Sequence, residues 1–147
     1  IEFQQEKERQ EKERKEVTIA YDADKVKIDL SQGKICFLAG GTGKPYFTTD
    51  TAATMRAIEL KVDAILMGKN GVEGVYDKDP RKDPTAKFFP LITYQEMIKL
   101  NLQIMDQTAL ELIKDKNIKV RVFRMDANNC IKAAKGEDVG TVCQKGE

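Results

Sequence analysis

The stretch between residues 40 and 50 decides the fold, and it reads Gly40-Gly41-Thr42-Gly43-Lys44-Pro45-Tyr46-Phe47-Thr48-Thr49-Asp50. The apolar segment Lys34–Ala39 precedes it, and residues 51–60, rich in helix formers, follow it. This order predicts a strand, a glycine loop and a helix. Glycines let backbone N–H groups approach an anion closely, and the first turn of a helix adds unpaired donors and a partial positive charge. The loop is therefore a candidate phosphate site.

Side chains in and after this loop add to its polar character. Thr42, Thr48 and Thr49 supply hydroxyl donors, and Asp50 is placed either to cap the helix or to meet a cation. The spacing fits neither the dinucleotide fingerprint nor the P-loop. A bare Gly-Gly-x-Gly segment is equally compatible with an ordinary strand-to-helix connection, in which glycines serve the turn and threonines cap the helix.

Composition narrows the function classes. A chain of 147 residues with 41% hydrophobic content can build one domain with a core. Because 25 Lys and Arg oppose 24 Asp and Glu, the charge gives no reason to expect a nucleic-acid or membrane partner. Three cysteines without any histidine argue against a mixed metal site and predict reduced thiols in a cytoplasmic protein. The missing histidine points to chemistry by positioning and electrostatics.

Residues 1–16 are a charged low-complexity arm, whereas residues 17–147 carry the pattern of a folded domain. Opposite charges in the arm recur at helical spacing, but a helix there has no apolar face to bury. We expect a solvated or frayed segment. A coiled-coil or docking arm is the alternative.

The domain alternates between apolar strands and helices. Asp63–Met67 is expected to form a second buried strand after the helix, and two strands flanking a helix make a parallel unit. Ligands in such folds bind beyond the carboxyl ends of the strands, where Gly40 and Lys69 fall. Before the glycine loop we expect a helix or irregular turn at 17–30. After the second strand we expect a hairpin or extended piece at 74–80, a polar loop at 81–90 and a helix opened by a Thr93–Glu96 capping box. The remaining expected elements are a helix at 106–116, a strand at 118–123, a helix at 129–135 and a strand at 141–143.

The string at 40–50 closely resembles the Gly-Gly-Thr-Gly-Asn-Pro-Phe-Phe-Thr-Thr-Asp signature of bacterial uridylate (UMP) kinases, a branch of the amino-acid kinase family. Three further motifs resemble that family in order and spacing: Val72-Glu73-Gly74-Val75-Tyr76 with Asp79-Pro80, Ile104-Met105-Asp106, and Val120-Arg121-Val122-Phe123. The resemblance runs from roughly Gln32 to Thr141. It implies an α/β fold, a three-layer sandwich with a mainly parallel sheet, here incomplete.

The resemblance also implies roles for single residues. The UMP site would comprise Gly41, Thr42, Gly43, Lys44, Thr48 and Thr49. Asn70, Tyr76 and Asp79 match positions that contact ATP, and Lys69 is placed to supply a cation to its phosphates. Asp106 matches an aspartate that orients phosphate-neutralising lysines, and with Asp50 it completes the catalytic set. Mg²⁺ would arrive with ATP, so no resident metal site is expected.

Two departures from the family pattern matter. Lys44 replaces an asparagine that helps to recognise the monophosphate, and Tyr46 replaces a phenylalanine. In addition, residues 1–33 lack the phosphate loop and much of the UMP pocket that precede this region in the family. The chain thus resembles the carboxyl-terminal, ATP-binding half, and we expect it to be incompetent as a kinase alone. The whole protein would move the γ-phosphoryl of ATP to UMP and, by resemblance, form a homo-oligomer, typically a hexamer.

Two other functions remain open at this stage. One is a different amino-acid kinase that acts on a carboxylate or carbamate, although the Pro45–Asp50 run argues against it. The other is a non-catalytic nucleotide-binding or assembly module in which the charged arm mediates association.

Overall fold

The computed structural model describes residues 2–146, and the chain divides into two compact units at Ala39. The first unit holds the helices α1 (Glu2–Val17) and α2 (Ala23–Ser31). Side chains 3–13 of α1 are exposed, and Arg9 pairs with Glu6 at 2.9 Å and with Glu13 at 3.7 Å. The charged arm is therefore helical from Glu2, and its side chains 3–13 are solvated. The alternative, a coiled-coil or docking arm, stays a hypothesis.

The expected strand at Lys34–Ala39 is wrong, because these residues are irregular in the structure. Asp22 caps α2 by accepting from the backbone N–H of Lys25 at 2.9 Å, and that helix ends at Ser31. Ile35 and Phe37 beyond it are 84% and 94% exposed. Apolar content favours a strand, but a strand also needs a neighbour that accepts its backbone hydrogen bonds, and this segment has no assigned partner in the part of the chain described.

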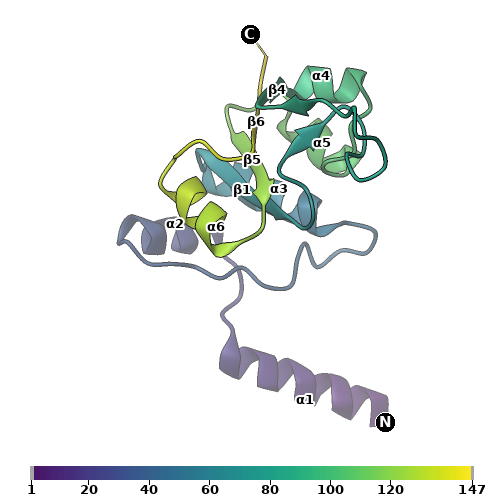
Figure 1. The fold of residues 1–147 in the computed structure, drawn as a ribbon. Coiled ribbons are helices and arrows are strands. Elements are labelled where there is room, and N and C mark those ends of the chain that lie inside the picture. Colours follow the sequence, from purple (N-terminus) through teal and green to yellow (C-terminus); the bar gives the residue numbers. More distant parts are fainter. Residues whose placement is uncertain (1, 147) are drawn as a thin grey trace. The chain divides into compact units, whose positions relative to one another are not determined.

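The second unit, from Gly40 onward, is built on a four-stranded sheet. Its spatial order is β1 (Ala64–Lys69), β5 (Lys119–Arg124), β6 (Thr141–Gln144) and β4 (Leu91–Thr93). The β1–β5 and β4–β6 pairs are parallel, whereas β5 and β6 run antiparallel, so the predicted mainly parallel sheet is confirmed. Figure 1 shows β5 next to β1 in the middle of this unit.

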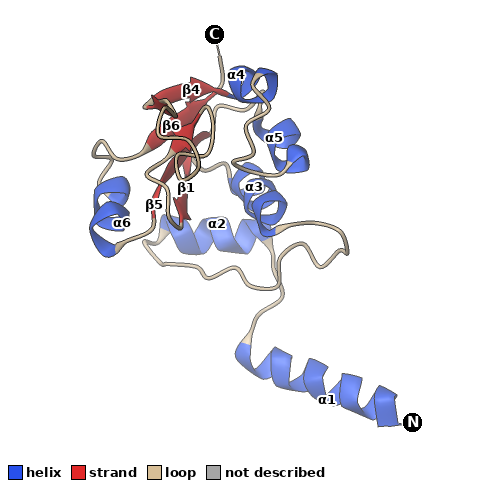
Figure 2. Ribbon diagram, turned by 45° about the vertical axis from the view of Figure 1, so that its right-hand side comes forward, coloured by secondary structure: helices blue, strands red, loops and turns tan. Residues whose placement is uncertain are grey.

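Helices cover both faces of this sheet. Figure 2 shows α6 (Ala127–Ala134) on one side and α3 (Thr49–Leu60) and α5 (Gln107–Ile113) on the other. The helices α3 and α5 pack on each other, and α3 also contacts β1. These three layers agree with the predicted sandwich. A fourth helix, α4 (Tyr94–Lys99), follows β4 directly.

The core lies between the sheet and the helices α3 to α5. Burial of the apolar side chains in this core is the main force that holds the unit together. The hydroxyl of Tyr94 stays satisfied by donating to the carbonyl of Ile118 at 2.7 Å. The largest side chains with almost no exposure include Tyr94, Met97, Ile113, Val75, Val120, Val122 and Cys143.

The polar loop expected at 81–90 is partly wrong. Two short strands, β2 (Val75–Tyr76) and β3 (Phe88–Phe89), pair antiparallel as a separate two-stranded sheet, and β4 begins directly after Pro90. The rings of Tyr76 and Phe88 pack edge to face, with their centroids 5.3 Å apart. Strands of two and three residues are too short to show a period-two pattern, so the sequence gives little signal for them.

Capping residues set the starts of the helices. The predicted capping box is confirmed: Thr93 accepts from the backbone N–H of Glu96, and the Glu96 carboxylate accepts from that of Thr93. The last helix, however, begins two residues before the expected Asn129. Asp126 caps it by accepting from the Asn129 backbone N–H at 2.9 Å, which lets the helix start at Ala127.

Candidate functional site

The glycine loop has the backbone that its sequence predicts. Gly40, Gly41 and Gly43 have positive φ angles of 87°, 60° and 69°, a region that side chains disfavour. The hydroxyl of Thr42 accepts from the Lys44 backbone N–H at 3.1 Å and so closes a small turn. Lys44 itself is exposed. The ammonium group of Lys44 is thus open to solvent, whereas its backbone N–H is bonded within the loop.

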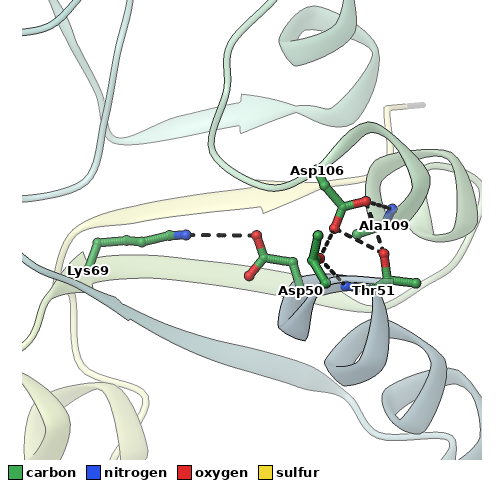
Figure 3. Close-up of polar contacts among 6 residues, drawn as sticks. Asp50, Thr51, Lys69, Asp106 and Ala109 are labelled. Atoms are coloured by element: carbon green, nitrogen blue, oxygen red, sulfur yellow. Dashed lines mark hydrogen bonds and ion pairs between the residues drawn. The ribbon is translucent and has the colours of Figure 1, made fainter. Parts of the chain in front are cut away.

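The end of this loop is tied to a distant aspartate. Thr48 caps α3 by accepting from the Thr51 backbone N–H at 3.2 Å, and its hydroxyl donates to the Asp106 carboxylate. The Thr51 hydroxyl lies 3.0 Å from both Asp106 oxygens. Asp106 also caps α5 by accepting from the backbone N–H of Ala109 at 2.9 Å, as Figure 3 shows. One carboxylate therefore joins the starts of two helices.

This arrangement keeps Asp106 charged. Partial burial by itself would raise the pKa of its carboxyl group. The hydrogen bonds donated by Thr48, Thr51 and the Ala109 backbone outweigh burial and hold that pKa below its usual value. A carboxylate with a lowered pKa and these donors is a weak proton acceptor, so the geometry suits Asp106 to orienting its neighbours rather than to removing a proton.

Asp50 meets a cation, one of the two expectations for it, while Thr48 takes the capping role. The carboxylate of Asp50 lies 4.0 Å from the ammonium of Lys69, and both side chains are about two-thirds buried. Asp50 belongs to the first turn of α3, and Lys69 is the last residue of β1. Lys69 therefore stands at the carboxyl end of its strand, as predicted, with its charge held near the start of a helix (Figure 3).

Two hollows adjoin at Lys69. The first has a volume of about 430 Å³, and Asp50, Lys69 and Asp106 contribute to its lining. The second has a volume of about 530 Å³, and its lining includes Lys69, Asn70, Tyr76 and Asp79. The structure thus brings together all four residues expected to bind ATP, and it places both expected catalytic carboxylates in the neighbouring hollow. The expected UMP residues of the glycine loop line neither of these two hollows.

The second hollow, which we call the groove, has an aromatic and a charged wall. Tyr76 comes from β2 and rests against Phe88 of β3. The carboxylate of Asp79 accepts from the backbone N–H of Arg81 at 3.0 Å and from its guanidinium at 3.0 and 3.2 Å. The guanidinium of Arg81 holds the pKa of Asp79 below its usual value. Arg81 lines the groove as well and adds a cation that the sequence analysis did not single out.

The segment Asn101–Ile104 lines both hollows, although it was not among the site residues predicted from sequence. Asn101 adopts a positive φ of 52° just after α4, and the Leu102 backbone N–H bonds back to the carbonyl of Met97 at 3.0 Å. An asparagine that follows a short helix is a usual sign of such a left-handed end. The signal was present in the sequence, but only the fold shows that this turn faces Lys69.

Within residues 2–146, no group of three or more potential ligands could hold a metal ion, and no helix is long and apolar enough to cross a membrane.

Comparison with known proteins decides the family. Residues 3–124 match the amino acid kinase family. The chain belongs to that family. It is 49% identical over 131 residues to a uridylate kinase of Mycoplasma capricolum subsp. capricolum. The matched region covers 88% of this chain and 55% of that protein. It is 51% identical over 109 residues to the uridylate kinase of Mycoplasmopsis synoviae, which covers 74% and 46%.

Solved structures agree with this family membership. The crystal structure of UMP kinase from Bacillus anthracis superposes with a TM-score of 0.84 at 36% identity, over 89% of this chain and 54% of that one. UMP kinase from Ureaplasma parvum gives 0.77 at 38% identity, over 85% and 54%. The predicted resemblance to uridylate kinases is thus confirmed. This amino acid kinase family chain spans about half the length of the curated relatives it matches.

Proposed function

We propose that this chain is the nucleotide-binding portion of a uridylate kinase, and that the whole protein transfers the γ-phosphoryl group of ATP to UMP to give UDP. The observation that carries the proposal is the pair of hollows that adjoin at Lys69. One holds the four residues expected to bind ATP, and the other holds both expected catalytic carboxylates. The relatives named uridylate kinase and UMP kinase support the same proposal.

ATP is assigned to the groove. The ring of Tyr76 suits a nucleobase, and Asp79 retains acceptor capacity for ribose or base donors beside Arg81. Asn70 follows Lys69 at the end of β1 and adds an amide that can donate and accept. Lys69 lines both hollows, so its charge can act on phosphates lying at their junction.

Phosphoryl transfer asks for positioning and charge neutralisation more than for covalent chemistry. Lys69 supplies positive charge, and Asp50 sets the direction of its side chain through their ion pair. Asp106 fixes the starts of α3 and α5, which flank the first hollow. Mg²⁺ carried by ATP would neutralise the donor phosphates. Asp50 and Asp106 then act by orienting cations and helices in a site that has no histidine base.

UMP is assigned to the glycine loop and the start of α3. Gly41 and Gly43 turn the backbone so that its N–H groups are free to approach a phosphate. Hydroxyl donors and one cation complete the assigned set, which consists of Gly41, Thr42, Gly43, Lys44, Thr48 and Thr49. Lys44 adds charge to a phosphate contact where the family pattern has an amide, at the expense of an acceptor for the base.

We also propose that the whole protein acts in the cytoplasm as a homo-oligomer, hexameric by its resemblance to bacterial uridylate kinases. Light scattering on the complete protein tests the subunit number. Deleting residues 1–16 then asks whether the exposed helix α1 takes part in association.

ATP binding to the 147-residue chain, measured by calorimetry, is the first test. We expect Asp79→Asn to weaken it at least about tenfold, since a charge-assisted hydrogen bond contributes about 1.5–3 kcal/mol. Asp83→Asn is the matched control: Asp83 follows four residues later and also pairs with a cation, Lys78, at 2.7 Å, but it does not line the groove. Equal effects of both variants, or no ATP binding, would refute the assignment.

UDP formation from UMP tests the reaction itself. We expect the complete protein to form UDP and the 147-residue chain to bind ATP without turnover. ATP binding with no turnover by the complete protein would favour a non-catalytic module. Phosphorylation of a carboxylate or carbamate in a substrate panel, without UDP, would favour the other kinase class.

A further inference from the structure

The two-stranded sheet β2–β3 forms part of the wall of the groove, yet it is too small to hold itself in place. It has only two residue pairs, Val75 opposite Phe89 and Tyr76 opposite Phe88. A two-stranded sheet is marginally stable in water even at greater length. Because Tyr76 belongs to β2 and Asp79 follows it, the shape of the groove depends on whatever fixes this small sheet.

One buried hydroxyl group of the main sheet bonds to both strands of this small sheet. Thr141, the first residue of β6, is fully buried. Its Oγ1 accepts from the backbone N–H of Val75 at 2.8 Å and donates to the carbonyl of Phe89 at 2.5 Å. Val75 and Phe89 are the two residues that face each other across β2 and β3. The hydroxyl therefore bonds to both strands at once, across 66 residues of sequence on one side and 52 on the other.

The neighbouring glycine gives this hydroxyl its space. A Cβ added at Gly74 would lie 2.5 Å from Thr141 Oγ1 and 2.9 Å from Cε2 of Phe88, distances that real Cβ atoms do not tolerate. The backbone at residue 74 therefore passes close over Thr141. This fit positions β2 as it leaves the turn that follows Lys69 and Asn70 in the chain.

We propose that Thr141 is a positioning residue of the nucleotide groove: its hydroxyl holds β2 and β3, and through them Tyr76, in the arrangement that receives ATP. The inference rests on the proposed function of the groove. Thr141 is not among the residues lining it, so it acts through Tyr76 and not by touching the nucleotide. Without the hydroxyl, the buried N–H of Val75 and the partly buried carbonyl of Phe89 lose a partner, and the small sheet samples other positions. The apparent affinity for ATP then falls with the fraction of chains that keep the competent arrangement.

Thr141→Val tests this role, because valine has nearly the same shape but no hydroxyl. We expect its Kd for ATP to rise about tenfold and the Val75 amide to exchange faster with solvent by NMR. Thr141→Ser keeps the hydroxyl and is expected to restore both properties to near wild type. Thr54→Val is the matched control: Thr54 is equally buried, but its hydroxyl has no hydrogen-bond partner among the described residues, so ATP affinity should not change.

These variants distinguish a general loss of stability from a specific effect of the Thr141 hydroxyl on the ATP groove. If Thr141→Val binds ATP as tightly as the wild type, or if Thr54→Val weakens ATP binding as much, the inference is overturned. If Thr141→Val does not fold by circular dichroism, Thr141→Ala takes its place with the same expectation. A wild-type chain that binds no ATP would instead overturn the proposed function itself.

Discussion

Replacing Asp106 with alanine should destabilise the chain more than the loss of a helix cap alone. Loss of an aspartate cap costs about 1 kcal/mol. In addition, the Thr51 hydroxyl is buried and both oxygens of Asp106 lie 3.0 Å from it, so the substitution leaves that hydroxyl unpaired at a cost of about 1–3 kcal/mol. Thr48 is exposed and can bond to water instead. We therefore expect the free energy of unfolding to fall by about 2–4 kcal/mol.

Urea unfolding followed by circular dichroism measures this loss through the midpoint and slope. Asp126→Ala is the control, because Asp126 caps α6 at the same 2.9 Å distance but its other partners, Asn129 and Arg124, are close in sequence. It should cost about 1 kcal/mol. In a double-mutant cycle, Asp106→Ala and Thr51→Val should be coupled by at least 0.5 kcal/mol, an order-of-magnitude figure for residues in contact. Equal losses at Asp106 and Asp126, or additivity in the cycle, would refute the reasoning.

The same cluster predicts a pH dependence with a definite sign. The pKa of Asp106 is lower in the folded chain than the ordinary value near 4. The stabilisation it gives is therefore fully present above the unfolded pKa and is lost as the pH falls through the folded one. Stability of the wild type should decline below about pH 4 more steeply than that of Asp106→Asn. Parallel curves for the two proteins would contradict the lowered pKa.

Three further predictions concern the packing around the site. Gly74→Ala should lower the free energy of unfolding by about 1–3 kcal/mol in urea, because its Cβ would overlap Thr141; an unchanged midpoint would contradict the close fit. Tyr94→Phe should cost about 1–2 kcal/mol by the same assay, because the buried carbonyl of Ile118 loses its donor, and a neutral result would mean that water replaces it. Burial raises the pKa of the Cys143 thiol to about 12, so iodoacetamide at pH 8 should label it only as urea unfolds the chain, as peptide mass spectrometry would show; labelling of the native protein would contradict its burial.

Local chemistry made much of the fold predictable from sequence. The Thr93–Glu96 capping box and the strands around 63–67 and 118–123 lie close to where they were expected. These features depend on residues a few positions apart, which a sequence shows directly. The motif resemblance gave the family for the same reason, since its residues keep their order and spacing along the chain.

Only the tertiary structure shows which residues far apart in the sequence contact each other. Lys34–Ala39 has the composition of a strand but not its conformation, because composition does not supply a neighbouring strand. The Asp106 carboxylate reaches Thr51 across 55 residues, and the Thr141 hydroxyl reaches Val75 across 66. Side chains pair according to their positions in space, so the sequence identified these residues singly, or not at all, and the packing of α3, α5 and the sheet decided which of them bond.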